Sequence, residues 1–164
     1  MSRKVFFSFH YKNDVWRANV VRNSWVTKAD TQAAGFIDAA DFEKVEKDGD
    51  KSIKNWINDQ LLGTTVTVVL IGKETSDREY VKYELEKSWE RKNGILGIYV
   101  HQIKDRYGNT SLKGENAFGP LFTTYADSKK YFFERFKTYD WVNDNGYNNM
   151  GMWIELAHKK SLSL

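Results

Sequence analysis

Residues 66–71 read VTVVLI, and Gly72 follows them directly. An unbroken apolar run rich in β-branched residues is typical of a strand that is buried on both faces. Two further runs of this kind, at residues 5–9 (VFFSF) and 95–100 (ILGIYV), lie before and after it in the chain. Segments with apolar residues at helical spacing separate these runs. This alternation of buried strands with helices predicts βαβ units and a parallel sheet.

Weaker patterns complete the predicted order of elements. Short strands are expected at residues 35–38 and 138–142. Asn13 or Asp14 is expected to cap the first helix and Asp50 the second, and Gly63 suits a helix end that requires a positive φ. The apolar stripes of the four expected helices are Ala18, Val21 and Trp25; Ile53, Trp56, Ile57 and Leu61; Val81, Leu85 and Trp89; and Met150, Trp153, Ile154 and Ala157.

Five strands in a chain of 164 residues suit one α/β domain, residues 1–164, with a flavodoxin-like sheet in the order 2-1-3-4-5 and helices on both faces. In this order a crevice lies beyond the carboxyl ends of strands 1 and 3, between residues 8–13 and 72–84. Residues 101–136 lack periodicity and are expected to form a surface insertion with some local structure, away from the crevice. Replacing residues 108–116 by a short linker should then leave the melting temperature nearly unchanged.

The composition excludes several classes of protein. The chain has no cysteine, and its three histidines, His10, His101 and His158, are too scattered for a zinc site, so no metal is expected. Its 25 basic and 22 acidic residues are spread along the sequence without the basic stripe of a nucleic-acid-binding protein. Neither an apolar run of membrane-spanning length nor a signal-peptide pattern is present. A cytoplasmic protein without nucleic-acid or membrane partners is therefore expected.

Glu84 is the strongest candidate for chemistry. On the helix expected from residue 79, it lies roughly 60° around the axis from Val81, at the margin of the apolar stripe. A carboxylate in this position is partly desolvated, and it can bind a ligand hydroxyl or face a developing positive charge. The alternative is a surface glutamate that pairs with Lys87, and helical spacing alone favours this simpler interpretation.

The loop after the first strand holds further polar candidates. Ser8, His10, Tyr11 and Asn13 surround an expected helix N-terminus, where backbone N–H groups can bind an anion such as a phosphate. The same residues could simply cap the helix. Asp38, at the end of the expected second strand, could bind a ribose or cap the segment that follows it.

Other nucleotide-binding and phosphoacceptor signatures are absent. No G-x-G-x-x-G follows the first strand, so a dinucleotide would not bind in the Rossmann manner, and no P-loop motif is present. A response-regulator receiver would need an acidic pair after strand 1 and an aspartate at the end of strand 3. This chain has SFH at residues 8–10 and IGK at residues 71–73, which excludes that chemistry.

Several motifs together resemble the TIR-like proteins of the bacterial Thoeris antiphage system, over roughly residues 3–105 and 138–154. The two main matches are an aromatic strand with a serine-aromatic turn, and a third strand with the helix that follows it. The matching segments are residues 4–11 (KVFFSFHY), 67–75 (TVVLIGKET), 80–84 (YVKYE), 20–28 (VVRNSWVTK), 33–35 (AAG) and 139–142 (YDWV).

The resemblance implies an enzyme, an NAD glycohydrolase or cyclase, with NAD as its substrate and no separate cofactor. Enzymatic TIR domains cleave the nicotinamide–ribose bond of NAD with a glutamate on the helix after strand 3, which is Glu84 here. Phe9 or Tyr11 could stack on the nicotinamide, and Tyr83 lies beside the catalytic position. The substrate-binding residues expected are therefore Ser8, Phe9, His10, Tyr11, Asp38 and Tyr83.

The resemblance also implies a place in defence. The product would be a cyclic or conjugated ADP-ribose that activates a separate effector protein. The resemblance leaves open whether a phage-derived trigger is required, whether the protein forms a homo-oligomer, and which product is made. The alternative is a non-enzymatic TIR scaffold that acts through protein–protein contacts, and an absence of NAD turnover would favour it.

Overall fold

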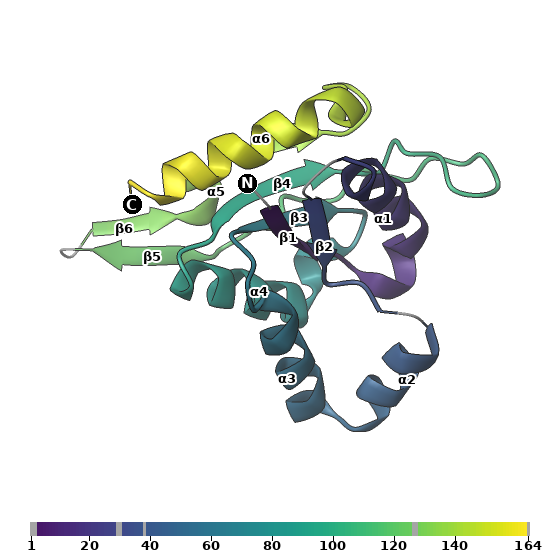
Figure 1. Ribbon diagram of the computed structural model, residues 1–164, viewed down its shortest axis with the longest axis horizontal. Helices are drawn as coiled ribbons and strands as arrows, with labels where there is room; N and C mark the ends of the chain where they lie inside the picture. The colour runs from purple at the N-terminus through teal and green to yellow at the C-terminus, as the bar shows by residue number, and fades with distance from the viewer. Residues whose placement is uncertain (1–2, 29–30, 38, 126–127, 164) are drawn as a thin grey trace.

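The computed structural model describes residues 3–28, 31–37, 39–125 and 128–163. Within these residues a parallel sheet runs in the order β2-β1-β3-β4-β7, which confirms the predicted order with β7 as its fifth strand (Figure 1). The strands are β1 (Arg3–Ser8), β2 (Thr31–Ala34), β3 (Val66–Ile71), β4 (Gly94–Tyr99) and β7 (Thr138–Asp140). Every residue of β3 is buried, as expected for a central strand with both faces covered.

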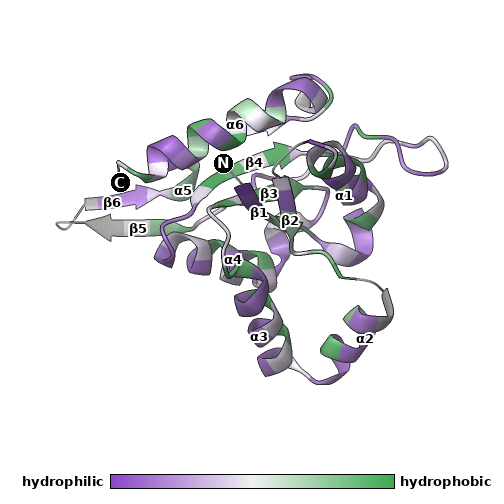
Figure 2. Ribbon diagram, in the orientation of Figure 1, coloured by the Kyte–Doolittle hydropathy of each residue, from purple (hydrophilic) through white to green (hydrophobic). Residues whose placement is uncertain are grey.

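Helices cover both faces of the sheet (Figure 1). One face carries α1 (Tyr11–Val26) and α6 (Gly146–Ser161), and the other carries α3 (Asp50–Leu61), α4 (Glu79–Glu90) and the short α5 (Phe132–Arg135). Figure 2 shows that the central strands are largely hydrophobic, whereas much of α3 is hydrophilic. None of the helices in the described ranges is long and apolar enough to cross a membrane.

The core between the sheet and the α1–α6 layer contains Phe7, Val68 and Trp153. Trp153 stacks on Tyr139 of β7 with ring centroids 4.1 Å apart, so the edge strand is fixed to α6 by an aromatic pair. The predicted stripe of the last helix is confirmed for Met150, Trp153 and Ile154, which are all buried. Gly63 has a φ of 77°, as predicted for the end of α3.

The predictions for the second strand and the first helix cap are wrong. β2 occupies residues 31–34 and not 35–38, because Gly35 has a φ of 91° and leaves the strand geometry. A side chain at Gly35 would also collide with the backbone carbonyl of Phe7, so glycine is required where the chain turns away. His10, and not Asn13 or Asp14, is the N-cap of α1, and its Nδ1 accepts a hydrogen bond from the Asn13 N–H.

Helix α2 (Ala39–Lys47) was not predicted. It follows β2 and leads directly into α3, whose first residue is Asp50. Phe42 and Val45 form a short apolar face three residues apart, which is a weak signal in a segment dominated by charged residues. This helix changes the shape of the candidate site because it adds a wall that the simple βαβ pattern does not provide.

The prediction that residues 101–136 form a surface insertion is wrong for the part of this segment from residue 117 onward. It contains the antiparallel hairpin of β5 (Phe122–Tyr125) and β6 (Ser128–Tyr131), followed by α5. Four of its apolar side chains are buried in the core beneath α4: Ala117, Phe118, Phe132 and Phe136. The segment was expected to be exposed because aromatic residues without periodicity give no strand or helix signal.

The first half of the segment is also attached to the domain. The Arg17 guanidinium donates hydrogen bonds to the carbonyl oxygens of Ile103 (2.7 Å) and Asn109 (3.0 Å). Gly114 lies directly against the Gly72 carbonyl oxygen, and a side chain at Gly114 would collide with that oxygen. The loop therefore approaches the carboxyl end of β3, and the expectation that replacing residues 108–116 would leave stability unchanged does not fit these contacts.

Candidate active site

Glu84 lies on the inner side of α4, between Val81 and Leu85 of the buried stripe. Its side chain is only 7% exposed, although a glutamate in the middle of a helix is usually solvated. Lys87, the partner in the alternative interpretation, instead forms an ion pair with Glu90 at 3.1 Å. The alternative interpretation, in which Glu84 pairs with Lys87 at the surface, is therefore wrong. Glu84 lies at the margin of the apolar stripe, as predicted, and it is buried there.

The Glu84 carboxyl has no counterion among the residues that the structure describes. Its Oε2 atom makes no hydrogen bond there, and neither does the buried hydroxyl of Ser8 at the end of β1. Burial raises the pKa of the Glu84 carboxyl from 4.5 to about 8, and interaction with the Ser8 hydroxyl offsets part of this rise. A buried carboxyl without a counterion is costly for folding, and such groups concentrate at functional sites.

Glu84 borders a pocket at the carboxyl ends of β1 and β2, enclosed by α2, α3 and α4. The cavity within this pocket is small, about 80 Å³, and it opens to solvent. Its walls are mainly aromatic and aliphatic. The side chains that form them include Phe7, Phe9, Tyr11, Phe42, Trp56, Tyr80 and Val81.

Two charged side chains of opposite sign also line this pocket, Arg78 and Glu46. Arg78 is the N-cap residue of α4, so its cation and the N-terminal N–H groups of that helix are at the same end. Glu46 lies 3.4 Å from the ammonium group of Lys12. The pocket thus combines an apolar interior, a buried acid and an arginine at a helix N-terminus.

The structure brings three of the predicted site residues together with Glu84. Phe9 and Tyr11 line the pocket, and Ser8 acts on the Glu84 carboxyl from the end of β1. The Tyr11 ring stacks on Phe42 of α2 with centroids 4.1 Å apart, which fixes it as part of the wall.

The other predicted contacts are not in this pocket. His10 caps α1 and does not line the pocket. Burial and then the Arg78 cation lower the pKa of His10, and this keeps its Nδ1 free to accept the capping hydrogen bond. Tyr83 turns toward α3, where its hydroxyl donates to Asn58 Oδ1 at 3.0 Å, so a contact between Tyr83 and a ligand beside Glu84 does not fit this geometry. Asp38 lies outside the described residues.

Sequence reasoning missed the outer wall of the pocket. Phe42 comes from the unpredicted α2, and Trp56 was assigned to the core stripe of α3. Arg78 and Tyr80 belong to the start of α4, and Tyr80 lies four residues before Glu84, one turn away on the same helix face. This spacing is the one signal in the sequence that could have placed Tyr80 beside Glu84.

We expect Glu84→Gln to make the protein more stable, by an amount that depends on pH. With a folded-state pKa of about 8 against 4.5, the folded protein keeps a proton on Glu84 that the unfolded chain releases. The stability of the unmodified protein should therefore fall as pH rises from about 4.5 to about 8, whereas the amide is insensitive to pH. The gain from Glu84→Gln should be small at pH 5 and should reach a few kcal/mol near pH 8.

Urea unfolding of both proteins at pH 5, 6.5 and 8 measures this difference. Every other titrating group is common to the two proteins, including the buried Asp14, so those contributions cancel. A stability difference that is the same at all three pH values would show that Glu84 is ionised in the folded protein throughout this range.

The fold and the site together define a TIR-like α/β domain: a parallel sheet in the order β2-β1-β3-β4-β7, with a buried glutamate beside an aromatic pocket on α4, the helix after the third strand. The family model described as Thoeris protein ThsB, TIR-like domain, matches residues 6–105. A protein of Bacillus cereus (strain MSX-D12), ThsB1, named as a candidate cyclic ADP-D-ribose synthase, is 38% identical over 191 aligned residues. That alignment covers 94% of this chain and 100% of the relative. The chain belongs to the ThsB family of Thoeris TIR-like proteins.

Proposed function

We propose that this protein is an enzyme that cleaves NAD at the nicotinamide–ribose bond and releases a cyclic or conjugated ADP-ribose. That product would be a signal that activates a separate effector protein in antiphage defence. Membership of the ThsB family and the name of the Bacillus cereus relative support this proposal. The observation that carries it is the buried Glu84 carboxyl, which has no counterion among the described residues, at an aromatic pocket.

The reaction suits a single carboxylate in such a pocket. Nicotinamide in NAD is a cationic leaving group, so its departure requires no general acid. The ribose then becomes oxocarbenium-like, as in glycoside cleavage. An ionised Glu84 beside the ribose stabilises this positive charge, and the interaction is strong because the surroundings are apolar. The high pKa of the free carboxyl is consistent with this role, because a cationic substrate would favour ionisation of the carboxyl on binding.

Other residues of the pocket supply orientation and exclude water. Phe9 and Tyr11 provide rings on which the nicotinamide can stack, and Arg78 provides a cation for the diphosphate. Formation of a cyclic product requires a nucleophile of the same molecule to react before water does. An aromatic enclosure of this kind favours that outcome because it can hold ADP-ribose folded and limit the access of water.

We expect kcat/KM for NAD to rise with pH and then to level off. The ionised form of Glu84 is the active one, and its pKa in the free protein is about 8. Below that pH the rate should increase about tenfold per pH unit, because the ionised fraction does so. Initial rates at low NAD concentration between pH 6 and 9.5 measure the profile. A flat profile over this range would contradict a catalytic carboxylate with a raised pKa.

Mass spectrometry of the small molecules formed from NAD by the purified protein, with and without phage lysate, tests the proposed function. Nicotinamide should appear together with a product that has the mass of cyclic ADP-ribose or of an ADP-ribose conjugate. Free ADP-ribose as the sole product would assign a glycohydrolase. NAD that stays intact under both conditions would favour a scaffold that acts through protein contacts.

A further inference from the structure

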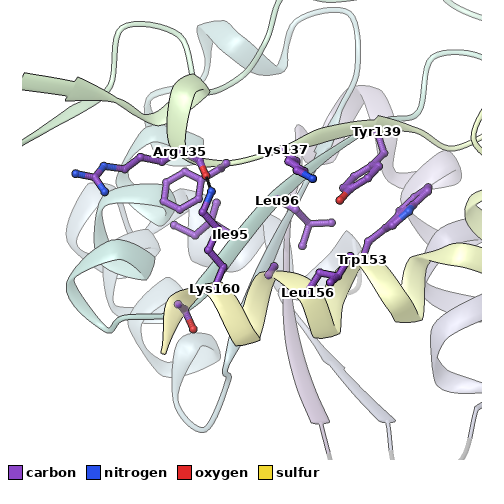
Figure 3. Close-up of a pocket in the computed structure, with 12 residues that line it drawn as sticks. Ile95, Leu96, Arg135, Lys137, Tyr139, Trp153, Leu156 and Lys160 are labelled. Carbon is purple, nitrogen blue, oxygen red and sulfur yellow. Dashed lines mark hydrogen bonds between the residues drawn. The ribbon is translucent and has the colours of Figure 1, made fainter. Parts of the chain in front are cut away.

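A second cavity lies on the opposite side of the sheet from Glu84, between α6 and the strands β4 and β7. We name it the α6 trough, and it holds about 700 Å³ of space including its opening. Its floor is apolar and includes Leu96 of β4 and Trp153 of α6. In Figure 3 the Tyr139 side chain lies beside Trp153, with its hydroxyl directed into the trough.

Positive charge gathers around the α6 trough. Lys137, Lys160 and Arg135 line it, and no aspartate or glutamate is among its lining residues. The Arg135 guanidinium is directed away, where its Nε donates to Thr123 Oγ1 at 3.1 Å and its carbon lies 5.2 Å from the centre of the Trp89 ring. The two lysines are therefore the cations available to a bound molecule.

The two lysines differ in how they are held. Lys160 reaches back to donate a hydrogen bond to the Arg135 carbonyl oxygen, and this places its ammonium group at one end of the trough. The ammonium group of Lys137 makes no ion pair or hydrogen bond among the described residues, and Figure 3 shows the Lys137 side chain above Leu96. Burial lowers the pKa of Lys160, and the cations of Lys130, Lys137 and Arg135 lower it further, so positive charge is concentrated here without compensation.

We propose that the α6 trough binds a small anion that carries a flat apolar group. The anionic group would lie between Lys137 and Lys160 and accept a hydrogen bond from the Tyr139 hydroxyl. The flat group would lie on Leu96 and Trp153. Concave apolar sites with a few convergent polar groups are the usual form of a small-molecule pocket, and ammonium groups are common partners of phosphate.

This site is separate from the proposed NAD pocket and does not depend on it. The Glu84 pocket is enclosed by α2, α3 and α4, whereas the α6 trough is enclosed by α6, β4 and β7, and the two share no lining residue. Ligand binding in the α6 trough can therefore be tested independently of NAD cleavage.

Titration of the full chain with 1-naphthyl phosphate, followed by amide shifts in NMR, tests the proposal. The largest shifts should fall on Leu96, Tyr139 and Trp153. Inorganic phosphate and 1-naphthol, each of which carries half of the recognised chemistry, should bind at least tenfold more weakly. The Glu84→Gln variant should bind the probe as the unmodified protein does, since its change lies in the other pocket.

The matched variants are Lys137→Gln with Lys160→Gln, which remove the two cations and keep most of each side chain. They should weaken probe binding at least tenfold. Lys51→Gln with Lys104→Gln, two exposed lysines outside the trough, change the net charge equally and should leave binding unchanged. Equal binding by both pairs of variants, or shifts confined to the Glu84 pocket, would overturn the proposal. Amide shifts in the trough on addition of a poly-glutamate peptide, with no shifts on addition of 1-naphthyl phosphate, would overturn the proposal and would instead assign this surface to an acidic protein partner.

Discussion

Glu84→Gln should reduce NAD consumption by roughly a hundredfold or more while the fold stays intact. The loss corresponds to about 3 kcal/mol of transition-state stabilisation, which is typical when one electrostatic group is removed. The amide fills the same space as the carboxyl but cannot carry the negative charge that stabilises the ribose cation. Because the protonated acid is close to an amide in shape and polarity, the variant resembles the unmodified protein at low pH.

Glu86→Gln is the matched control, because Glu86 is an exposed residue of the same helix and lies outside the aromatic pocket. It should retain the activity of the unmodified protein. Circular dichroism of both variants would verify that the fold is kept. If Glu84→Gln consumed NAD at the unmodified rate, the carboxylate would have no catalytic role, whatever its burial.

Phe118→Ala should destabilise the domain by about 3–5 kcal/mol, the usual cost of deleting a fully buried aromatic ring. Phe118 is 0% exposed, and its ring lies 5.8 Å from that of Phe136, centre to centre. The ring belongs to a buried cluster that also contains Ile71 of β3 and Leu85 of α4. The substitution would leave a cavity between the sheet and the segment that follows it.

Leu112→Ala is the control within the same segment, because Leu112 is 69% exposed. Its effect should stay within about 0.5 kcal/mol, as for most surface substitutions. Urea unfolding at one fixed pH compares the two variants. Similar small effects for both would restore the sequence-based expectation that residues 101–136 are a surface insertion.

The parts of the fold that were predicted correctly are those in which local sequence determines the outcome. The run at residues 66–71 is the central strand β3, and its unbroken apolar pattern predicted its burial on both faces. The angle between Glu84 and Val81 correctly placed Glu84 at the margin of the stripe, but helical spacing alone favoured a surface pair with Lys87, and the packing of α4 against the sheet is what buries Glu84.

The parts that were missed depend on contacts between distant segments. β2 ends at Ala34 because Gly35 must pass close to the backbone of Phe7, and no local pattern carries that information. Phe118 is buried in a cluster with apolar residues of β3, β4 and α4, which lie far from it in sequence. The outer wall of the pocket is likewise formed where α2 and α3 pack together, so its composition could not be read from either helix alone.

The contact between Gly114 and the Gly72 carbonyl has a consequence for exchanging parts between relatives. The loop after β4 and the loop that leads from β3 to α4 meet there without any side chain between them, and Gly72 itself has no room for one because Asp14 lies against it. A graft of one loop from a relative with a larger residue at either position would push the start of α4 outward. Loop chimaeras within this family should therefore succeed only when both loops are transferred from the same parent.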